Sequence, residues 1–591
     1  MSKNTKLYKD FLIWRYKHIS ERQFIYILSV FVGFLAGFGT FLLKDITFLI
    51  EELLQGNFIK KYHYSLYFVF PIIGLLLVFL IKKFVLKREI GHGISTTLRA
   101  ISKRNGRIEQ YKIVASILTA PITVGFGGSA GLQGPAVSTG AALGANVSQF
   151  FHLNVKTRML LIGCATAGAM SSMFQAPIAA IIFAVEIFSL DLAFISLVPL
   201  LLASVSAVIT SYFFVGTDVL FRFKLIDVFQ IKDIPFYIVL AIITGFASVY
   251  FSKMYFKIIT FFDKVKKPFQ KLLIGSVAIG IMLYLIPPLY GEGYGLINNL
   301  LTGNAIDSLQ ELPYNIDYEK TYLVIAMLLI VAVFKAIAMT TTFVAGGVGG
   351  VFIPTLFMGS ALGNATAKTI NQFGFSVSES NFTLIGMTGL MAGVLHAPLT
   401  AIFLIAEITG GYELFVPLML VAAISFAITK YFISNSIYTV ELAKKGELIT
   451  HNKDKNVLMM MKIEKLIEKN FISIYPTMTF GEMLKKSVSK SKRNIFPVID
   501  HKNEFLGVVL LDDIRPMMFE QEHYETTFVS DFMKSAPEII FIDDSTTSVM
   551  KKFKESDAWN LPVINNGKYV GFISKSKLLT AYRNKLIEVT M

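Results

Sequence analysis

The chain has a single cysteine, Cys164, in its 591 residues. One thiol cannot form an intrachain disulfide or a cysteine-based metal cluster, so both are excluded. Charged residues are also scarce, at 16% of the chain against about 25% in soluble domains. No set of a nucleophile, a histidine and an acid stands out, and neither does a group of metal ligands. We therefore expect no enzyme activity and no metal site.

Apolar residues dominate instead. They make up 54% of the chain, and the mean hydropathy of +0.58 predicts a polytopic membrane protein. The net charge of +15 comes from basic residues gathered beside apolar segments, as the positive-inside bias expects. Nucleic-acid binding is not expected, because the sequence shows no basic groove pattern with interleaved aromatic residues. No cleavable signal peptide is apparent, and the basic residues before the first apolar run predict a cytoplasmic N-terminus. We expect a multi-pass protein of the cell inner membrane.

Long apolar runs predict the membrane segments. Phe24–Leu54 and Leu66–Leu86 are each near or above the roughly 20 residues that a spanning helix needs. Residues 113–155 carry no charged side chain, yet Pro121, Pro135 and many glycines interrupt them. This segment predicts several short, broken helices rather than two clean spans. Further apolar blocks follow at 159–188, 192–214, 236–256, 272–289, 322–343, 349–365, 382–408 and 414–433.

The most informative stretch runs from Gly127 to Gly144 and reads GGSAGLQGPAVSTGAALG. It is uncharged and lies within an apolar region. In lipid, unwound backbone is tolerated only where it is buried in protein or lines a polar cavity. Because no lysine or arginine is near, a dehydrated anion held by main-chain N–H groups at helix N-termini is the ligand that this pattern favours.

The apolar region contains an internal repeat. APIAAIIFAVEI, from Ala176, matches APLTAIFLIAEI, from Ala397, and a glycine-rich turn precedes each copy, ending at Pro135 and at Pro354. Paired broken segments in two halves indicate a transporter-like fold with a binding site near the bilayer midplane. Close helix packing is the interpretation that we favour for four glycines of the repeat, Gly140, Gly144, Gly359 and Gly363.

The C-terminal part is different in character and contains a second repeat. Residues 494–514 and 560–578 each read as a buried strand, a turn, a second strand and the start of a helix. We predict a membrane domain over residues 1–441 and a linker over residues 442–460. Residues 461–591 then form two small α/β modules, at about 461–520 and 525–591.

At this point the chain resembles the CLC family of voltage-gated chloride channels and chloride/proton exchangers, followed by a pair of CBS domains. Gly91–Ser95, GHGIS, is similar to the family's GSGIP, and Gly131–Pro135, GLQGP, is similar to its G(K/R)EGP. Gly350–Pro354, GVFIP, matches its GxFxP, and Tyr438 fits a tyrosine expected after the last membrane helix. The resemblance implies an all-α membrane domain of two inverted repeats with broken helices. It also implies a homodimer in the lipid bilayer, with one pore per subunit and cytoplasmic CBS domains.

The resemblance also assigns chloride-binding residues. The central site is implied to involve the N–H groups of Val351 and Phe352 and the Tyr438 hydroxyl. The first motif adds His92, Gly93 and Ile94 to this site, and the outer site is implied to comprise Leu132, Gln133 and Gly134. Main-chain N–H groups suit a permeation path, because conduction needs sites that both hold and release chloride. A full ion pair with a lysine or arginine would trap the ion.

Two departures from the family concern protons. The second motif normally carries a glutamate that gates the pore and accepts a proton, whereas this chain has Gln133, whose amide cannot titrate. The inner glutamate of the exchangers aligns with Ile187, one residue after Glu186. We therefore predict a passive chloride channel in which Gln133 is a neutral gate. Glu186, and Glu407 in the second copy, are either functional acids or braces at the ends of the repeat.

Two alternatives stay open. The first is a chloride/proton antiporter that uses another proton route, for which Glu186 is a candidate. The second is a nucleotide-sensing membrane protein without ion transport, in which the glycine motifs only pack helices.

The CBS-like modules keep half of a ribose-contacting pattern each. The first retains Asp513 but has Leu510 at the hydroxyl position, and the second retains Ser574 but has Lys577 at the acid position. ATP or another adenine nucleotide is thus a possible ligand, and a purely structural role is the alternative. No cofactor is required for transport itself.

Overall fold

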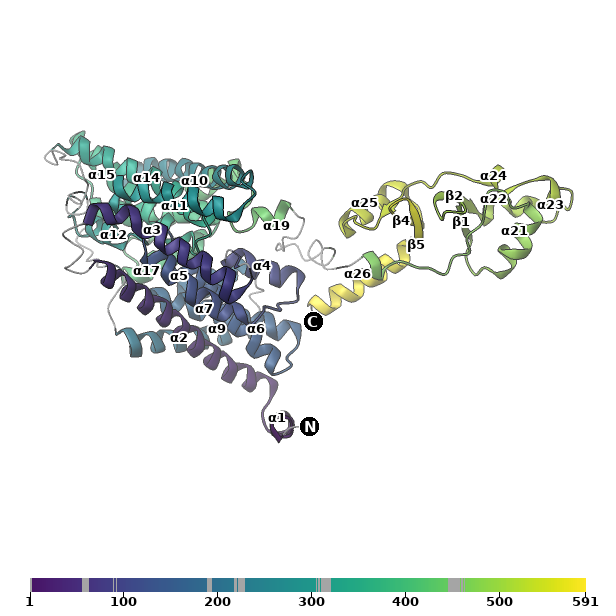
Figure 1. Cartoon of the computed structure of the whole chain (residues 1–591), viewed down its shortest axis with the longest axis horizontal. Helices are drawn as coiled ribbons and strands as arrows, with labels where there is room; N and C mark the ends of the chain where they lie inside the picture. The colour runs from purple at the N-terminus through teal and green to yellow at the C-terminus, as the bar shows by residue number, and fades with distance from the viewer. Residues whose placement is uncertain are drawn as a thin grey trace. The chain divides into compact units, whose positions relative to one another are not determined.

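The structure is a computed structural model that forms two compact units, Met1–Lys445 and Gly446–Met591, shown in Figure 1. It describes residues 3–55, 63–88, 90–91, 93–188, 194–216, 221, 229–304, 306, 309, 320–444, 458, 461 and 463–590. His92 and most of the predicted linker lie outside these residues.

The first half of the membrane unit consists of helices joined by turns and loops in its described residues. Its elements are α1 (Lys3–His18), α2 (Glu21–Gln55), α3 (His63–Leu80), the π-helix η2 (Ile81–Leu86), α4 (Gly93–Lys103), α5 (Tyr111–Gly125), α6 (Gln133–Phe150), α7 (Val155–Phe174), α8 (Pro177–Phe188) and α9 (Phe194–Val215). The uncharged segment is interrupted between α5 and α6, as its glycines and prolines predict.

The second half is built in the same way. Its elements are η3 (Ile231–Asp233), α10 (Ile234–Asp263), α11 (Pro268–Leu285), η4 (Pro287–Leu289), α12 (Tyr294–Leu301), α14 (Thr321–Val344), α15 (Phe352–Gln372), α16 (Glu379–Leu395), α17 (Pro398–Ile408), α18 (Phe415–Phe432) and α19 (Val440–Lys444). Among the described residues of the whole chain, seven helices are long and apolar enough to cross a membrane. The prediction of a multi-pass protein is therefore confirmed.

Small residues set the packing between consecutive helices of each half. In α6, a Cβ atom added to Gly140 would lie 2.6 Å from the Ala165 carbonyl oxygen of α7. In α15, a Cβ atom on Gly359 would lie 2.5 Å from the Gly386 carbonyl oxygen of α16. These glycines let the paired backbones touch, which is the helix-packing role that the sequence favours for them.

Gly363→Ala is expected to destabilise the membrane unit by about 1–3 kcal/mol, because its Cβ atom would overlap the Phe382 carbonyl oxygen and force α15 away from α16. The measurement is the thermal unfolding midpoint of the purified protein in detergent. Gly295→Ala in α12 is the control, since no heavy atom of a described residue lies within 4 Å of its added Cβ. Equal midpoints for the two variants would contradict the packing role.

The C-terminal unit contains two small sheets. β1 (Ile495–Ile499) pairs antiparallel with β2 (Phe505–Leu510), while β4 (Asn560–Asn565) pairs parallel with β3 (Ile540–Phe541) and antiparallel with β5 (Lys568–Ser574). The register shifts at the same place in both hairpins, after Val498 and after Val563. This shared irregularity confirms that the two modules are copies of one motif.

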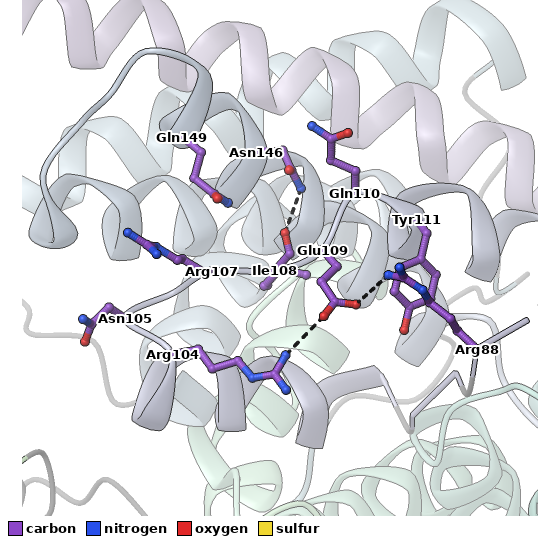
Figure 2. A pocket seen from close by; sticks show the side chains of 10 residues that line it. All are labelled: Arg88, Arg104, Asn105, Arg107, Ile108, Glu109, Gln110, Tyr111, Asn146 and Gln149. Carbon is purple, nitrogen blue, oxygen red and sulfur yellow. Dashed lines mark hydrogen bonds and ion pairs between the residues drawn. The ribbon is translucent and has the colours of Figure 1, made fainter. Parts of the chain in front are cut away.

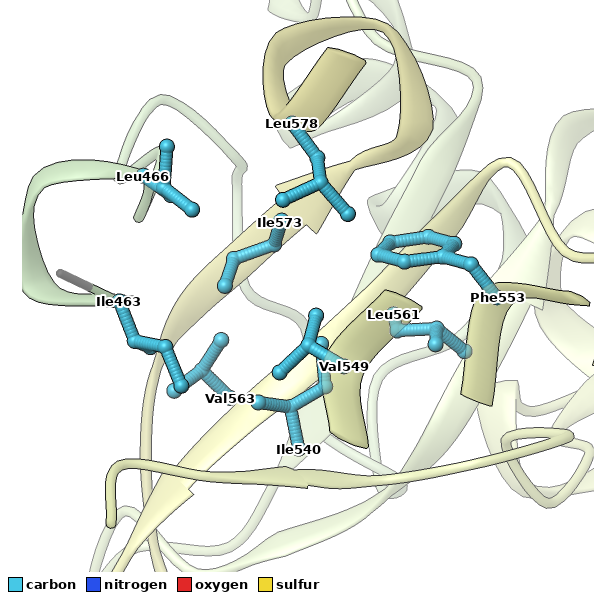
Figure 3. Packing of buried hydrophobic residues seen from close by; sticks show 9 residues of the cluster. All are labelled: Ile463, Leu466, Ile540, Val549, Phe553, Leu561, Val563, Ile573 and Leu578. Carbon is cyan, nitrogen blue, oxygen red and sulfur yellow. The ribbon is translucent and has the colours of Figure 1, made fainter. Parts of the chain in front are cut away.

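Short helices cover these sheets and complete the two cores. They are η5 (Ile463–Lys465), α21 (Phe480–Lys486), η6 (Val488–Lys490), α22 (Leu511–Ile514), η7 (Arg515–Met517), α23 (His523–Thr526), α24 (Val529–Phe532), α25 (Thr546–Ser556) and α26 (Lys575–Thr590). Figure 3 shows the second core, where Val549 and Phe553 of α25 face Leu561, Val563 and Ile573 of the sheet. The mixed α/β character predicted for residues 461–591 is confirmed.

Candidate functional site

The second and third glycine motifs meet in the membrane unit. The Gly131 N–H donates to the Gly350 carbonyl at 3.0 Å, and the Gly350 N–H donates back to the Gly131 carbonyl at 2.6 Å. A Cβ atom on Gly350 would lie 2.6 Å from the Gly134 nitrogen, so only glycine allows this approach. The two hydrogen bonds bring the N-termini of α6 and α15, which belong to different halves, to one place.

The N-terminus of α4 completes this arrangement around a small cavity of about 20 Å³, which has room for one water-sized body. Predicted site residues from three separate motifs, Gly93, Gly134 and Tyr438, line it together. The other lining residues are Ile94, Ser95, Tyr255, Phe343, Gly349, Gly350, Val351 and Ile437. None of these described lining residues is charged, and the first N–H groups of each helix have no partner within their helix.

Of the residues predicted for the central site, Tyr438 has a side chain available to a ligand and Phe352 does not. The Tyr438 hydroxyl is buried beside the cavity and has no hydrogen-bond partner among the described residues. A buried hydroxyl without a partner is costly, which indicates a ligand at this point. The Phe352 ring, in contrast, packs against Phe174 and Phe183, so only the main chain of Phe352 remains available to an anion.

The predicted outer site contains a residue that the sequence analysis missed. The Leu132 N–H donates to Oε1 of Glu292 at 2.9 Å, and Nε2 of Gln133 donates to the same oxygen at 3.2 Å. The Gln133 amide also reaches the Tyr294 hydroxyl at 3.3 Å. A carboxylate of the protein therefore lies where the sequence predicts an anion. The signal in the sequence was an acid between two glycines, GEG, in an otherwise apolar stretch.

Buried and partly buried ionisable side chains surround Glu292. Lys44 and Glu51 of α2 and Lys335 of α14 all interact with its carboxylate electrostatically. Lys44 donates to the Met173 carbonyl at 2.7 Å, and Lys335 is fully buried. Buried lysines and acids within a membrane domain are rarely incidental, because each costs free energy unless it is paired.

The acids at the ends of the repeat are used for helix capping. Glu186, at the end of α8, accepts the N–H groups of Leu399 and Thr400 at the start of α17, at 3.2 and 2.9 Å. Glu407, at the end of α17, accepts the N–H groups of Ile178 and Ala179 at the start of α8, at 3.0 and 2.7 Å. Each half thus caps the other, which favours the bracing interpretation. Ile187, the aligned inner position, is buried and apolar.

A second cavity, of about 830 Å³, is lined by several basic residues (Figure 2). Glu109 lies between Arg88, at 3.3 Å, and Arg104, at 3.6 Å, and Arg107 lines the same cavity. The paired side chains are about half exposed, so solvent weakens these ion pairs.

The two predicted nucleotide contacts are engaged within the protein. Asp513 pairs with Lys534 at 2.9 Å, although its Oδ2 atom is buried and has no hydrogen-bond partner in the part of the chain that the structure describes. The Ser574 hydroxyl donates to Glu468 at 2.5 Å, and Glu468 also pairs with Arg493. Burial raises the pKa of Glu468, but Ser574 and Arg493 outweigh it and hold that pKa below its usual range.

Glu468→Gln is expected to loosen the second module at neutral pH. A carboxyl whose pKa is lowered by folding stabilises the folded state above its unfolded pKa, and this stabilisation is lost as the pH falls through the folded pKa. The variant and the wild type should therefore differ at neutral pH and converge in acid. Hydrogen exchange of β4 and β5 in the full-length protein measures this. A difference that persists unchanged in acid would contradict the ion-pair role.

Known proteins resemble both units. The family profile described as voltage gated chloride channel matches residues 73–430, and the CBS domain profile matches residues 463–519 and 529–584. The voltage-gated ClC-type chloride channel ClcB of Escherichia coli is 24% identical over 368 residues, which cover 61% of this chain and 82% of that protein.

Solved structures share the fold. The structure of a slow cyanobacterial Cl⁻/H⁺ antiporter matches with a TM-score of 0.58 and 20% identity, over 72% of this chain and 98% of that one. A CLC-type fluoride/proton antiporter matches with a TM-score of 0.56 and 22% identity, over 70% of this chain and 96% of that one. The predicted fold, a helical membrane domain followed by a small α/β pair, is confirmed.

Proposed function

The chain belongs to the family of voltage-gated chloride channels, with two CBS domains after its membrane unit, and on this premise we propose that it conducts chloride and similar small anions passively across a membrane. The resemblance drawn from the glycine motifs is thereby confirmed. The family is one of transport proteins rather than enzymes.

One observation carries the proposal: three helix N-termini and an unpartnered Tyr438 hydroxyl meet at one uncharged cavity. Helix N-termini carry partial positive charge, and each favours an anion by about 0.5–2 kcal/mol. Such a site binds chloride moderately and lets it leave, as conduction requires. The residues that we propose as the central site are Gly93, Ile94, Val351, Phe352 and Tyr438, and His92 joins them on the sequence argument alone.

Passive conduction is supported by the two positions where coupled exchange needs acids. Gln133 cannot titrate, and Ile187 is apolar. Glu186, the remaining candidate for an inner proton site, is held by three hydrogen bonds to α17. We propose that it braces the fold and does not carry protons.

The test is reconstitution of the purified protein in liposomes, with chloride efflux and internal pH recorded together. Chloride flux without stoichiometric proton movement is the expected result. Proton uptake driven by a chloride gradient would instead identify a chloride/proton antiporter, the second candidate, which the antiporters among the similar structures favour. No anion binding and no anion flux would leave the nucleotide-sensing alternative.

The remaining proposals follow the family. We propose a homodimer with one pore per subunit in the inner membrane, with the N-terminus and the CBS domains cytoplasmic. We propose that the membrane domain ends at residue 441 and that a linker reaches residue 460. Adenine nucleotide, with Asp513 and Ser574 as contacts, stays a proposal that binding of ATP to the purified protein would test.

A further inference from the structure

Glu292 lies in a turn whose shape is fixed by its neighbours. Gly291 and Gly293 on either side adopt φ angles of +53° and +85°, which residues other than glycine rarely adopt. A Cβ atom on Gly293 would lie 2.5 Å from the Phe357 ring. Lys335 donates to the Gly291 carbonyl at 3.0 Å and thereby ties the turn to α14. The side chain of Glu292 is therefore held toward α6 by the backbone that carries it.

The carboxylate of Glu292 lies at the N-terminus of α6, a helix of 18 residues. It accepts the Leu132 N–H at 2.9 Å and the Gln133 amide at 3.2 Å, while only 8% of the residue is exposed. Gln133 is fully buried, and its Oε1 atom has no partner among the described residues. The Gln133 side chain thus directs its NH₂ group at the carboxylate and leaves its own carbonyl oxygen unpaired, which indicates a site that favours negative charge.

Charged groups from three elements act on this carboxylate. Lys44 of α2 and Lys335 of α14 favour its ionised form, whereas Glu51 of α2 disfavours it, and the Tyr294 hydroxyl of α12 lies beside it. Glu292 itself is in the connection between α11 and α12, outside the seven spanning helices. Burial raises the pKa of Glu292 to about 7, although the Leu132 N–H, Gln133 and the two lysines oppose this rise.

We propose that Glu292 is a proton-operated gate at the outer anion position, supplied by a different segment from the motif that contains Gln133. In its ionised form the carboxylate occupies the Leu132 N–H and keeps chloride away. When it takes a proton from water it becomes neutral and a weaker acceptor, so chloride can take its place at the N–H group. This role rests on the proposed function, and it adds pH control to passive conduction.

The experiment is chloride efflux from liposomes that contain the full-length protein, with equal pH on both sides and the pH stepped from acid to alkaline. Wild-type flux should rise as the pH falls through neutrality. Above the midpoint it should drop by up to about tenfold per pH unit, because the protonated fraction does so. Glu292→Gln should conduct at the wild-type acid rate at every pH. Glu51→Gln removes a carboxyl that has no bond to Leu132 but disfavours ionised Glu292, so the pH response should remain, with its midpoint moved to lower pH.

A second variant keeps the test decisive if Glu292→Gln does not fold. Lys44→Met removes a positive charge that favours the carboxylate, so the midpoint should move to higher pH. An unmoved midpoint would overturn the proposal, as would a Glu292→Gln protein that keeps the wild-type pH response, or wild-type flux that is independent of pH. Folded wild-type protein without chloride flux at any pH would instead overturn the proposed function itself.

Discussion

Gly350→Ala is expected to lower chloride flux by about 100-fold or more. The added Cβ atom would lie 2.6 Å from the Gly134 nitrogen and 3.1 Å from the Gly134 Cα atom, so the two loops must separate. Separation breaks the pair of hydrogen bonds between Gly131 and Gly350 and moves the N-termini of α6 and α15 apart. The measurement is chloride efflux from liposomes at equal protein content.

Gly411→Ala is the matched control for this variant, because its added Cβ atom meets no heavy atom within 4 Å among the residues that the structure describes. Tyr438→Phe separates misfolding from loss of the site, since it keeps the ring and removes only the unpartnered hydroxyl. It should weaken chloride binding, measured by calorimetry, by about tenfold or more. Wild-type flux from Gly350→Ala would show that anions do not pass where the three helix N-termini meet.

Glu407→Ala is expected to destabilise the membrane unit by about 2–4 kcal/mol. The substitution leaves two N–H groups at the start of α8 without an acceptor and removes a negative charge from a helix N-terminus. Glu186→Ala should have a similar effect at α17, where three hydrogen bonds are lost. The thermal unfolding midpoint of the protein in detergent measures both effects.

Glu413→Ala provides the control, because this acid follows α17 closely and is exposed. Its midpoint should equal that of the wild type. If Glu186→Ala kept the wild-type midpoint but altered proton movement in liposomes, the capping role would be wrong, and Glu186 would return as a candidate proton site.

Features that depend on local chemistry could be predicted from the sequence. The break between α5 and α6 follows from glycines and prolines within a few residues, and the two halves follow from matching letters at Ala176 and Ala397. The hairpins of the C-terminal unit follow from alternating apolar strands and turns. In each case the signal is a short stretch of consecutive residues, or the recurrence of such a stretch.

Features that depend on distant contacts could not be predicted. Leu132 and Glu292 are 160 positions apart, so no spacing rule connects them. The motif that contains Gln133 predicts a neutral gate, whereas the structure brings a carboxylate to the neighbouring Leu132 N–H group from another segment. Glu186 and Glu407 were recognised as possible braces, but the sequence did not show that each acts on the opposite copy.

The exchange of carboxylates between α8 and α17 has a structural consequence. Two identical short chains, related by a twofold axis, would make the same pair of contacts, each lending one acid to its neighbour. Neither chain would be complete without the other, because a bare helix start would remain in each. The α8–α17 contact of the present polypeptide thus has the reciprocal chemistry of a symmetric dimer interface, inside a single subunit.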